Sequence, residues 1–240
     1  MSDILLEIDR LIASDCTLTD EEKTAAIEYA QTVWPQIRMR SAPEPEFLCI
    51  AGIPGAGKTA YIRRYNLEDR FVIVDPDHFR KYTPQYSILT SQNVVDSTKS
   101  FVDFLSTLII WIAIYARCPI CIPSTFCATD FWSVYLNKLK PYLCDRMYAT
   151  TLLVLEQPIA LSLYSFSMRS SSTSDAEPIT RPFDDFFFKD TSLKFKQSLQ
   201  ALMTLGFFSD VSILSRTELN QEYTSADPAW KSETCIQGDD

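Results

Sequence analysis

Eight consecutive residues have the types and spacing that bind a phosphate chain. They read Gly52-Ile-Pro-Gly-Ala-Gly57-Lys58-Thr59 and match the pattern G-x-x-x-x-G-K-[ST]. In such a loop, successive backbone N–H groups point at phosphate oxygens, the lysine reaches the β and γ phosphates, and the final hydroxyl binds Mg²⁺. The pattern therefore predicts a nucleoside-triphosphate site with Mg²⁺, and Thr59 is the expected metal ligand.

Glycine usage across the chain supports this interpretation. The chain has 240 residues and only 5 glycines, and three of the five lie within 52–57. Average usage of about 7% would supply roughly 17. An ordinary strand-to-helix turn is the alternative, and it gives no reason for this local excess. The residues expected to bind the nucleotide are Gly52, Pro54, Gly55, Ala56, Gly57, Lys58 and Thr59.

A second polar group follows the apolar run 71–74 and reads Asp75-Pro-Asp77-His78-Phe79-Arg80. Ligands of open α/β sheets bind beyond the carboxyl ends of the strands, so both carboxylates are expected to face the same crevice as the phosphate loop. A carboxylate there can accept a proton from an attacking hydroxyl or hold the water shell of the metal. The alternative is that they cap the next helix. For His78, the only histidine, an exposed or capping role is expected.

The elements that must position these groups alternate along the chain. Short runs rich in β-forming residues lie at 47–51, 71–74, 120–122, 152–155 and 211–214, and helical patterns lie at 58–66, 97–116, 129–140, 158–169 and 184–205. This alternation predicts an α/β fold of the P-loop kinase type, with three layers and a mostly parallel central sheet of about five strands.

A small helical segment is expected ahead of this domain. Apolar residues recur at helical spacing over 4–12, and Thr19-x-x-Glu22 is a capping box that announces a second helix, with Pro35 near its end. The stretch 41–46 alternates prolines with charges and reads as a linker. We therefore expect a helical segment at 1–44 and the kinase-like domain at 45–240.

Charge and hydropathy limit the classes of protein. The formal net charge is -9, and no dense run of Lys and Arg is present, which disfavours a large nucleic-acid partner but allows a small anionic substrate. The first residues lack the pattern of a secretory signal, so a cytosolic location is expected. The longest apolar run, 104–115, is shorter than the roughly 20 residues that span a bilayer, which argues against a membrane partner.

Seven cysteines are spread along the chain, an odd number that favours reduced thiols over a disulfide framework. Cys118 and Cys121 have the spacing of a redox or zinc pair, but no second pair or histidine accompanies them. A structural role in a strand is expected.

Two features narrow the class of nucleotide enzyme. The chain has no Asn-Lys-x-Asp run for guanine recognition, and 240 residues leave little room for the machinery of a motor, so a small-molecule kinase is favoured. The stretch 170–178 is polar and of low complexity, and a mobile loop or lid is the natural interpretation.

These motifs together resemble the zeta-toxin family of P-loop kinases. The phosphate loop is followed by Val74-Asp-Pro-Asp77-His-Phe-Arg80 and then by Pro84 and Tyr86, an order similar to that of the family. Further likenesses are the spacing of Pro158, Arg169 and Arg181 and the run Phe207-Phe-Ser-Asp210. The resemblance covers roughly residues 45 to 216.

The resemblance implies an ATP- and Mg²⁺-dependent kinase that phosphorylates a hydroxyl of a nucleotide sugar, UDP-N-acetylglucosamine in the best-known members. Asp77 would be the general base and Lys58 the ligand of the γ-phosphate. Arg169 and Arg181 would neutralise charge in the transition state, which suits two arginines that flank a lid. Asp75, Arg80 and Thr125 would contact the acceptor.

The sequence departs from the family pattern at the expected third strand end. Family members usually show Glu-Gly-Thr there with an Arg shortly after, whereas this chain reads Pro123-Ser124-Thr125-Phe126-Cys127. Only Thr125 is retained. The loss of one acid and one base removes two charge-assisted hydrogen bonds, so the acceptor is expected to differ, for example a dinucleotide.

Two other functions are compatible with the phosphate loop. A nucleotide-binding but catalytically silent module would act through a protein partner, such as an antitoxin or regulatory protein. A polynucleotide 5′-hydroxyl kinase would share the chemistry but needs a basic channel, which a pI of about 4.7 argues against.

Overall fold

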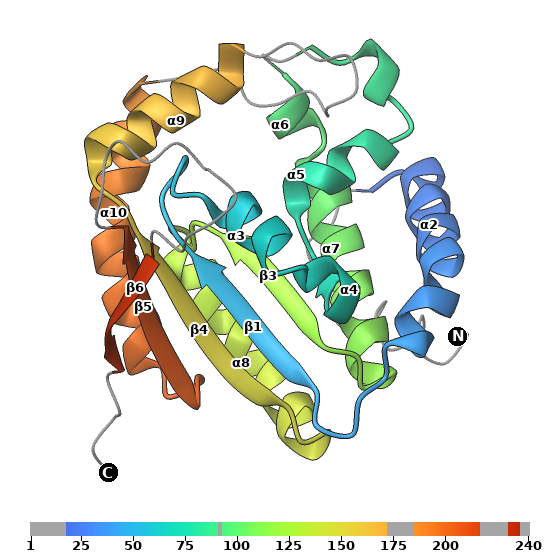
Figure 1. Cartoon of the computed structure of the whole chain (residues 1–240). Helices are drawn as coiled ribbons and strands as arrows, with labels where there is room; N and C mark the ends of the chain where they lie inside the picture. The colour runs from blue at the N-terminus through green and yellow to red at the C-terminus, as the bar shows by residue number, and fades with distance from the viewer. Residues whose placement is uncertain (1–17, 91–92, 172–184, 217–229, 236–240) are drawn as a thin grey trace.

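A six-stranded sheet forms the centre of the computed structural model. The structure describes residues 18–90, 93–171, 185–216 and 230–235. At 168–171, 185, 215–216 and 230–235 it describes the backbone alone. The strand order is β2-β3-β1-β4-β5-β6 (Figure 1). The strands are β1 (Glu46–Ala51), β2 (Val72–Ile73), β3 (Ile120–Ser124), β4 (Ala149–Glu156), β5 (Asp210–Arg216) and β6 (Trp230–Cys235). Strands β1 to β5 are parallel, and β6 pairs antiparallel with β5. The predicted α/β fold is confirmed, and β6 is added at one edge.

Helix α2 precedes β1, and the other described helices lie between the strands along the chain. The described helices are α2 (Asp20–Met39), α3 (Lys58–Arg64), α4 (Leu67–Arg70), α5 (Pro76–Phe79), α6 (Val94–Ser97), α7 (Lys99–Tyr115), α8 (Thr129–Asp145), α9 (Ile159–Ser171) and α10 (Asp185–Thr204), with 3₁₀ turns at Arg80–Tyr82 and Tyr86–Ile88. No helix in the described ranges is long and apolar enough to cross a membrane.

Helices cover both faces of the sheet. Successive side chains of a strand point to opposite faces, so apolar residues on both faces need to be buried. In β1, Phe47, Cys49 and Ala51 pack in a cluster with α2, α7 and α8, whereas Leu48 and Ile50 pack in a second cluster with α3, α4 and α9. Helix α10 contributes to both clusters. This two-sided burial explains why the central strands read as continuous apolar runs.

Helix α2 begins at the capping box that the sequence predicts. The hydroxyl of Thr19 accepts the N–H of Glu22 at 3.2 Å, and the Glu22 carboxylate accepts the N–H of Thr19 at 2.9 Å. The helix continues through Pro35 to Met39, and Figure 1 shows it along one side of the molecule next to α7. Its buried residues Ala26, Ala30 and Ile37 belong to the main core. The helix expected at 4–12 lies outside the described residues, and a boundary at residue 44 stays a prediction.

Candidate functional site

The phosphate loop curls at the carboxyl end of β1 and ends at the first turn of α3. Gly55 and Gly57 have φ values of 79° and 91°, in the left-handed region that glycine adopts without steric cost. The N–H of Ala56 donates to the carbonyl of Ile53 at 3.0 Å, which closes the turn. Gly57 is the N-cap of α3 and offers no side chain to its first N–H groups. The expected loop geometry is therefore present.

Lys58 folds back over this loop. Its Nζ donates to the carbonyl of Gly52 at 2.6 Å and to that of Ile53 at 3.1 Å. The ammonium thus lies at the start of the loop, where phosphate oxygens would compete for its protons. Thr59, the next residue and the expected metal ligand, is exposed.

Helix α9 packs directly against the loop. A Cβ added at Gly55 would lie 2.0 Å from the carbonyl oxygen of Ser162 and 3.1 Å from the backbone nitrogen of Phe166, both of them in α9. Gln157, at the end of β4, is buried, and its Nε2 donates to the carbonyl of Gly55 at 3.3 Å. Contacts with α9 and with Gln157, which follows β4, therefore restrict the conformation of the loop.

Asp75 lies at the end of β2, where its carboxylate accepts the N–H of Asp77 at 3.0 Å and so caps α5. The capping alternative is therefore present in the geometry. Burial, aided by the negative charge of Asp77, raises the pKa of Asp75 from 3.8 to about 6, while Lys58 acts in the opposite direction. The charge of Lys58, in the phosphate loop, therefore acts on the Asp75 carboxyl, and the place of Asp75 in the site stays a prediction.

Asp77 is the exposed carboxylate of the pair. Its side chain is 81% exposed, and Oδ1 accepts Nε of Arg80 at 3.0 Å. Arg80 is largely buried, and it also donates to the carbonyl of Val95 at 3.1 Å and to the hydroxyl of Thr98 at 2.7 Å. Arg80 therefore fixes the orientation of Asp77, and its expected contact with an acceptor stays a prediction.

The end of β3 lies beside the phosphate loop. Ala51 pairs with Ser124, and the N–H of Gly52 donates to the carbonyl of Ser124 at 3.3 Å. Thr125 is half-buried and directly follows Ser124, which places it near the loop, while its contact with an acceptor stays a prediction. Phe126 is fully buried at a φ of 53°, and its N–H donates to the hydroxyl of Ser124 at 3.2 Å.

Helix α10 packs against this strand end. The sulfur of Cys127 lies 3.5 Å from the carbonyl oxygens of Thr125 and Thr191. The hydroxyls of Thr129 and Ser198 lie 2.7 Å apart. Burial raises the pKa of the Cys127 thiol, which keeps the sulfur protonated at neutral pH. A helix distant in sequence thus contacts the segment that follows β3.

The two arginines expected in catalysis are not placed by their side chains. Arg169 belongs to the last turns of α9, and only its backbone is described. Arg181 and most of the stretch 170–178 lie outside the described residues. Their roles stay predictions.

Three further residues lie near the loop or near Cys127 and were not predicted from the sequence: Gln157, Asp190 and Lys194. Gln157 directly follows a strand, so the rule that picked out Asp75 applies to it as well. Asp190 and Lys194 form an ion pair on α10 at 2.7 Å, and such a spacing is typical of any exposed helix. No local signal distinguished them.

The cysteine pair behaves as a structural feature. Cys118 and Cys121 are free and buried, and burial raises the pKa of the Cys118 thiol to about 11. Within the described ranges, no group of three or more His, Cys, Asp or Glu could hold a metal ion.

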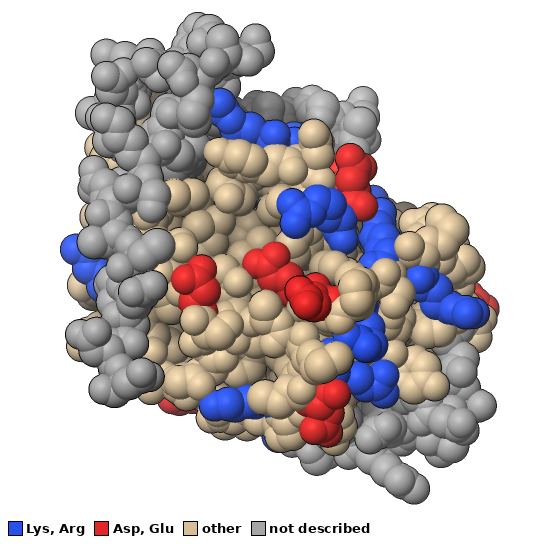
Figure 2. Space-filling model, turned by 60° about the horizontal axis from the view of Figure 1, so that its bottom comes forward, with Lys and Arg blue, Asp and Glu red and all other residues tan. Residues whose placement is uncertain are grey.

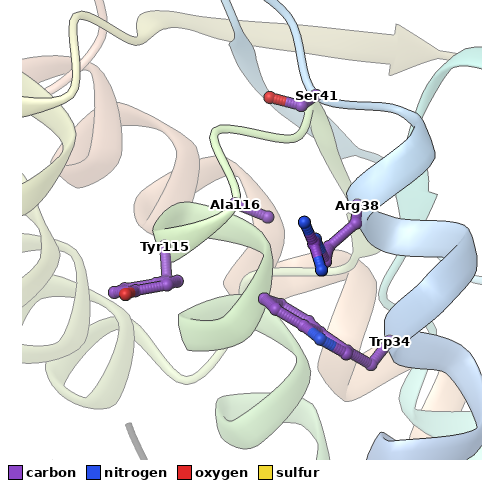
Figure 3. Close-up of a pocket in the computed structure, with 5 residues that line it drawn as sticks. All are labelled: Trp34, Arg38, Ser41, Tyr115 and Ala116. Carbon is purple, nitrogen blue, oxygen red and sulfur yellow. The ribbon is translucent and has the colours of Figure 1, made fainter. Parts of the chain in front are cut away.

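A separate pocket of about 520 Å³ lies where α2 and α7 end (Figure 3). Trp34 and Arg38 come from α2, and Tyr115 and Ala116 come from the end of α7. These helices end just before β1 and β3 begin, whereas the phosphate loop follows the end of β1. The pocket is therefore near the amino ends of the strands, whereas the candidate site is at their carboxyl ends.

A sequence model of the zeta toxin family matches residues 32–227, which is most of the chain. The chain belongs to the zeta toxin family. This membership confirms the resemblance carried by the phosphate loop and by the residues after β2, and it makes the protein a P-loop kinase-type toxin. A comparison with curated protein sequences finds no match.

Solved structures agree with the zeta toxin fold. A chain of the PezAT chromosomal toxin-antitoxin system of Streptococcus pneumoniae is similar, with a TM-score of 0.62 and 22% identity over 83% of this chain and 79% of that one. The AvrRxo1-ORF1:-ORF2 complex is similar in its native form, with a TM-score of 0.58 and 10% identity. The same complex with ATP has a TM-score of 0.55 and 11% identity. In both forms the match covers 83% of this chain and 65% of the other.

Proposed function

We propose that this zeta toxin is an ATP-dependent kinase that transfers the γ-phosphoryl group to a hydroxyl of a nucleotide sugar or a related nucleotide. The observation that carries the proposal is the phosphate loop with Lys58 folded over it, at the same sheet edge as Asp75 and Thr125. The similarity to a chain solved in a complex with ATP supports ATP as the donor. The cytosol, which contains ATP and nucleotide sugars, is the compartment that suits this reaction.

In the proposed reaction, the acceptor oxygen forms a bond to the γ-phosphorus as the bond to the β-phosphate oxygen breaks and ADP leaves. The hydroxyl proton passes to the carboxylate of Asp77, which Arg80 holds in a fixed orientation. Lys58 moves from the loop carbonyls to the phosphate oxygens. Arg169 and Arg181 neutralise charge in the transition state.

The donor groups of the site suit Mg²⁺, which is usually bound by one or two protein oxygens together with phosphates and waters. The hydroxyl of Thr59, an exposed residue, would bind the ion directly, and the carboxylate of Asp75 would hold its water shell. When bound, Mg²⁺ would offset the charge of the triphosphate.

The experiment that tests this proposal is phosphorylation of defined acceptors by the purified protein. We expect ATP-dependent phosphorylation of UDP-N-acetylglucosamine or of a dinucleotide such as NAD, measured by chromatography of the products. Asp77→Asn should abolish transfer and retain ATP binding. Binding of ATP–Mg²⁺ without transfer to any nucleotide-sugar or dinucleotide acceptor would contradict the proposal.

A catalytically silent module that acts through a protein partner is the second candidate. The segment Ser124 to Ala128, which begins at the end of β3, is uncharged. This favours the second candidate, because a kinase that no longer binds an acceptor would not need charged residues there. Growth inhibition by wild type, Lys58→Ala and Asp77→Ala in a permissive cell separates the two, since a silent module tolerates Asp77→Ala. In either case we propose an antitoxin as partner, as in the PezAT system.

A polynucleotide 5′-hydroxyl kinase is the least supported alternative. It needs a continuous basic channel, and the net charge of the chain is -9. On the face in Figure 2, basic and acidic side chains form small separate groups instead of a track. Failure to label an oligonucleotide 5′ end would exclude this activity.

A further inference from the structure

Helix α10 contacts the segment that follows β3. The strand end itself is uncharged, because Ser124-Thr-Phe-Cys-Ala128 carries no acid or base. Two contacts tie α10 to this segment: the sulfur of Cys127 lies 3.5 Å from the carbonyl of Thr191, and the hydroxyl of Ser198 donates to the carbonyl of Cys127 at 3.4 Å. Any charge on the α10 face between these two contacts must lie beside the end of β3.

Lys194 occupies that position. Residues 191, 194 and 198 are spaced by three and four, so they lie along one face of the helix. Thr191 and Ser198 are buried, whereas the side chain of Lys194 is 55% exposed. The stem of Lys194 thus starts on the packed face while its ammonium remains accessible to a ligand.

Electrostatics agrees with this placement. The positive charges of Lys58 and Lys194 both lower the pKa of the Cys127 thiol, and Asp190 raises it, against the larger effect of burial. The sulfur is therefore within reach of both the phosphate-loop lysine and the α10 ion pair. The two lysines approach the end of β3 from different elements.

We propose that Lys194 binds an anionic group of the acceptor, a phosphate or diphosphate, and that Asp190 weakens this binding by competing for the same ammonium. The inference rests on the proposed kinase function and specifies its substrate class as an anion held at the end of β3. The pair is 2.7 Å apart on a partly exposed surface, where an ion pair stabilises a helix only weakly. An incoming phosphate can therefore displace Asp190 from Lys194.

The test is calorimetric titration of UDP, as a diphosphate probe, into the full chain saturated with a non-hydrolysable ATP analogue and Mg²⁺. Lys194→Met should weaken UDP binding by at least about tenfold, the loss expected for one charge-assisted hydrogen bond. Asp190→Asn should tighten it. Lys196→Met removes the same charge from an exposed position on another face of α10 and should change it less than about twofold.

Equal UDP affinity in wild type and Lys194→Met, or an equal loss in Lys196→Met, would overturn the inference. Absence of UDP binding to wild type would also overturn it, although ATP-dependent phosphorylation of a nucleotide or a nucleotide sugar would still support the proposed function. If wild type does not bind the ATP analogue, the proposed function fails instead, and the titration without the analogue still tests Lys194. Binding of the analogue should be unchanged in Lys194→Met.

Discussion

The proposed donor and acceptor sides of the site are constructed in different ways. The donor side consists mainly of the backbone of one contiguous segment, 52–59, whose carbonyls hold Lys58 and whose Gly55 allows α9 to pack against it. The acceptor side consists of side chains from distant elements, such as Cys127 after β3 and Ser198 in α10. Substitutions on the donor side should therefore act mainly through backbone geometry, and those on the acceptor side through individual side-chain contacts.

The largest effect is expected at Lys58, the one charged side chain within the loop segment. Lys58→Met should lower the rate of phosphoryl transfer by about 1,000-fold, because a cation aimed at the developing charge is lost from a preorganised site. Steady-state kinetics measures this loss. Lys99→Met, which removes an exposed helix ion pair with Asp103, should leave the rate unchanged. A comparable rate in Lys58→Met and wild type would show that the loop is not the donor site.

Glycine substitutions test whether backbone packing defines the donor side. Gly55→Ala should lower the free energy of unfolding by about 3 kcal/mol, since the new Cβ meets Ser162 in addition to the strain of a positive φ. Gly206→Ala is the matched control. Its φ is 58° with no atom within 4 Å of the added Cβ, so the loss should be about 1 kcal/mol. Urea unfolding measures both, and equal losses would contradict the tight packing of α9 on the loop.

The raised pKa of Asp75 predicts a pH dependence of stability. Between the ordinary pKa near 4 and the folded value of about 6, the native state binds more protons than the unfolded state, so stability falls as the pH rises through this window. The loss should be on the order of 2 kcal/mol in wild type. It should be absent in Asp75→Asn, whose amide oxygen can still cap α5. Chemical denaturation at pH 4 and pH 7 measures this loss. The same change in the free energy of unfolding in wild type and Asp75→Asn would refute the raised pKa of Asp75.

The smallest effect tests the side-chain contacts of the acceptor side. A double-mutant cycle of Thr129→Val and Ser198→Ala should give a coupling of about 1 kcal/mol, because the two hydroxyls lie 2.7 Å apart across the interface of α8 and α10. The pair Thr32→Val and Ser198→Ala should be additive, since Thr32 bonds within α2. Zero coupling in the first cycle would mean that these hydroxyls do not join α10 to the strand end.

The same contrast explains what the sequence could predict. The phosphate loop and the first five strands follow from local patterns, because glycine spacing and apolar runs act within a few residues. β6 was missed, since Trp230-Lys-Ser-Glu-Thr-Cys235 carries two charges and lacks the apolar run of a buried strand.

The acceptor side depends on packing between distant segments, which no local pattern encodes. The guanidinium of Arg80 donates to Asp77 and also to Thr98, 18 positions further along the chain, while its expected contact with an acceptor stays a prediction. Lys194 lies 67 positions after Cys127 and reaches its neighbourhood only because α10 packs on the end of β3. The contacts of α10 with the segment after β3 could therefore be found only in the folded chain.

Mass spectrometry of a metabolite extract incubated with the protein, ATP and Mg²⁺ is the most direct test of the central claim. We predict that one or a few anionic nucleotide metabolites gain the mass of one phosphoryl group with wild type, and that none does with Asp77→Asn. An extract unchanged by wild type, while the protein still binds ATP, would contradict the assignment of this zeta toxin as an active kinase.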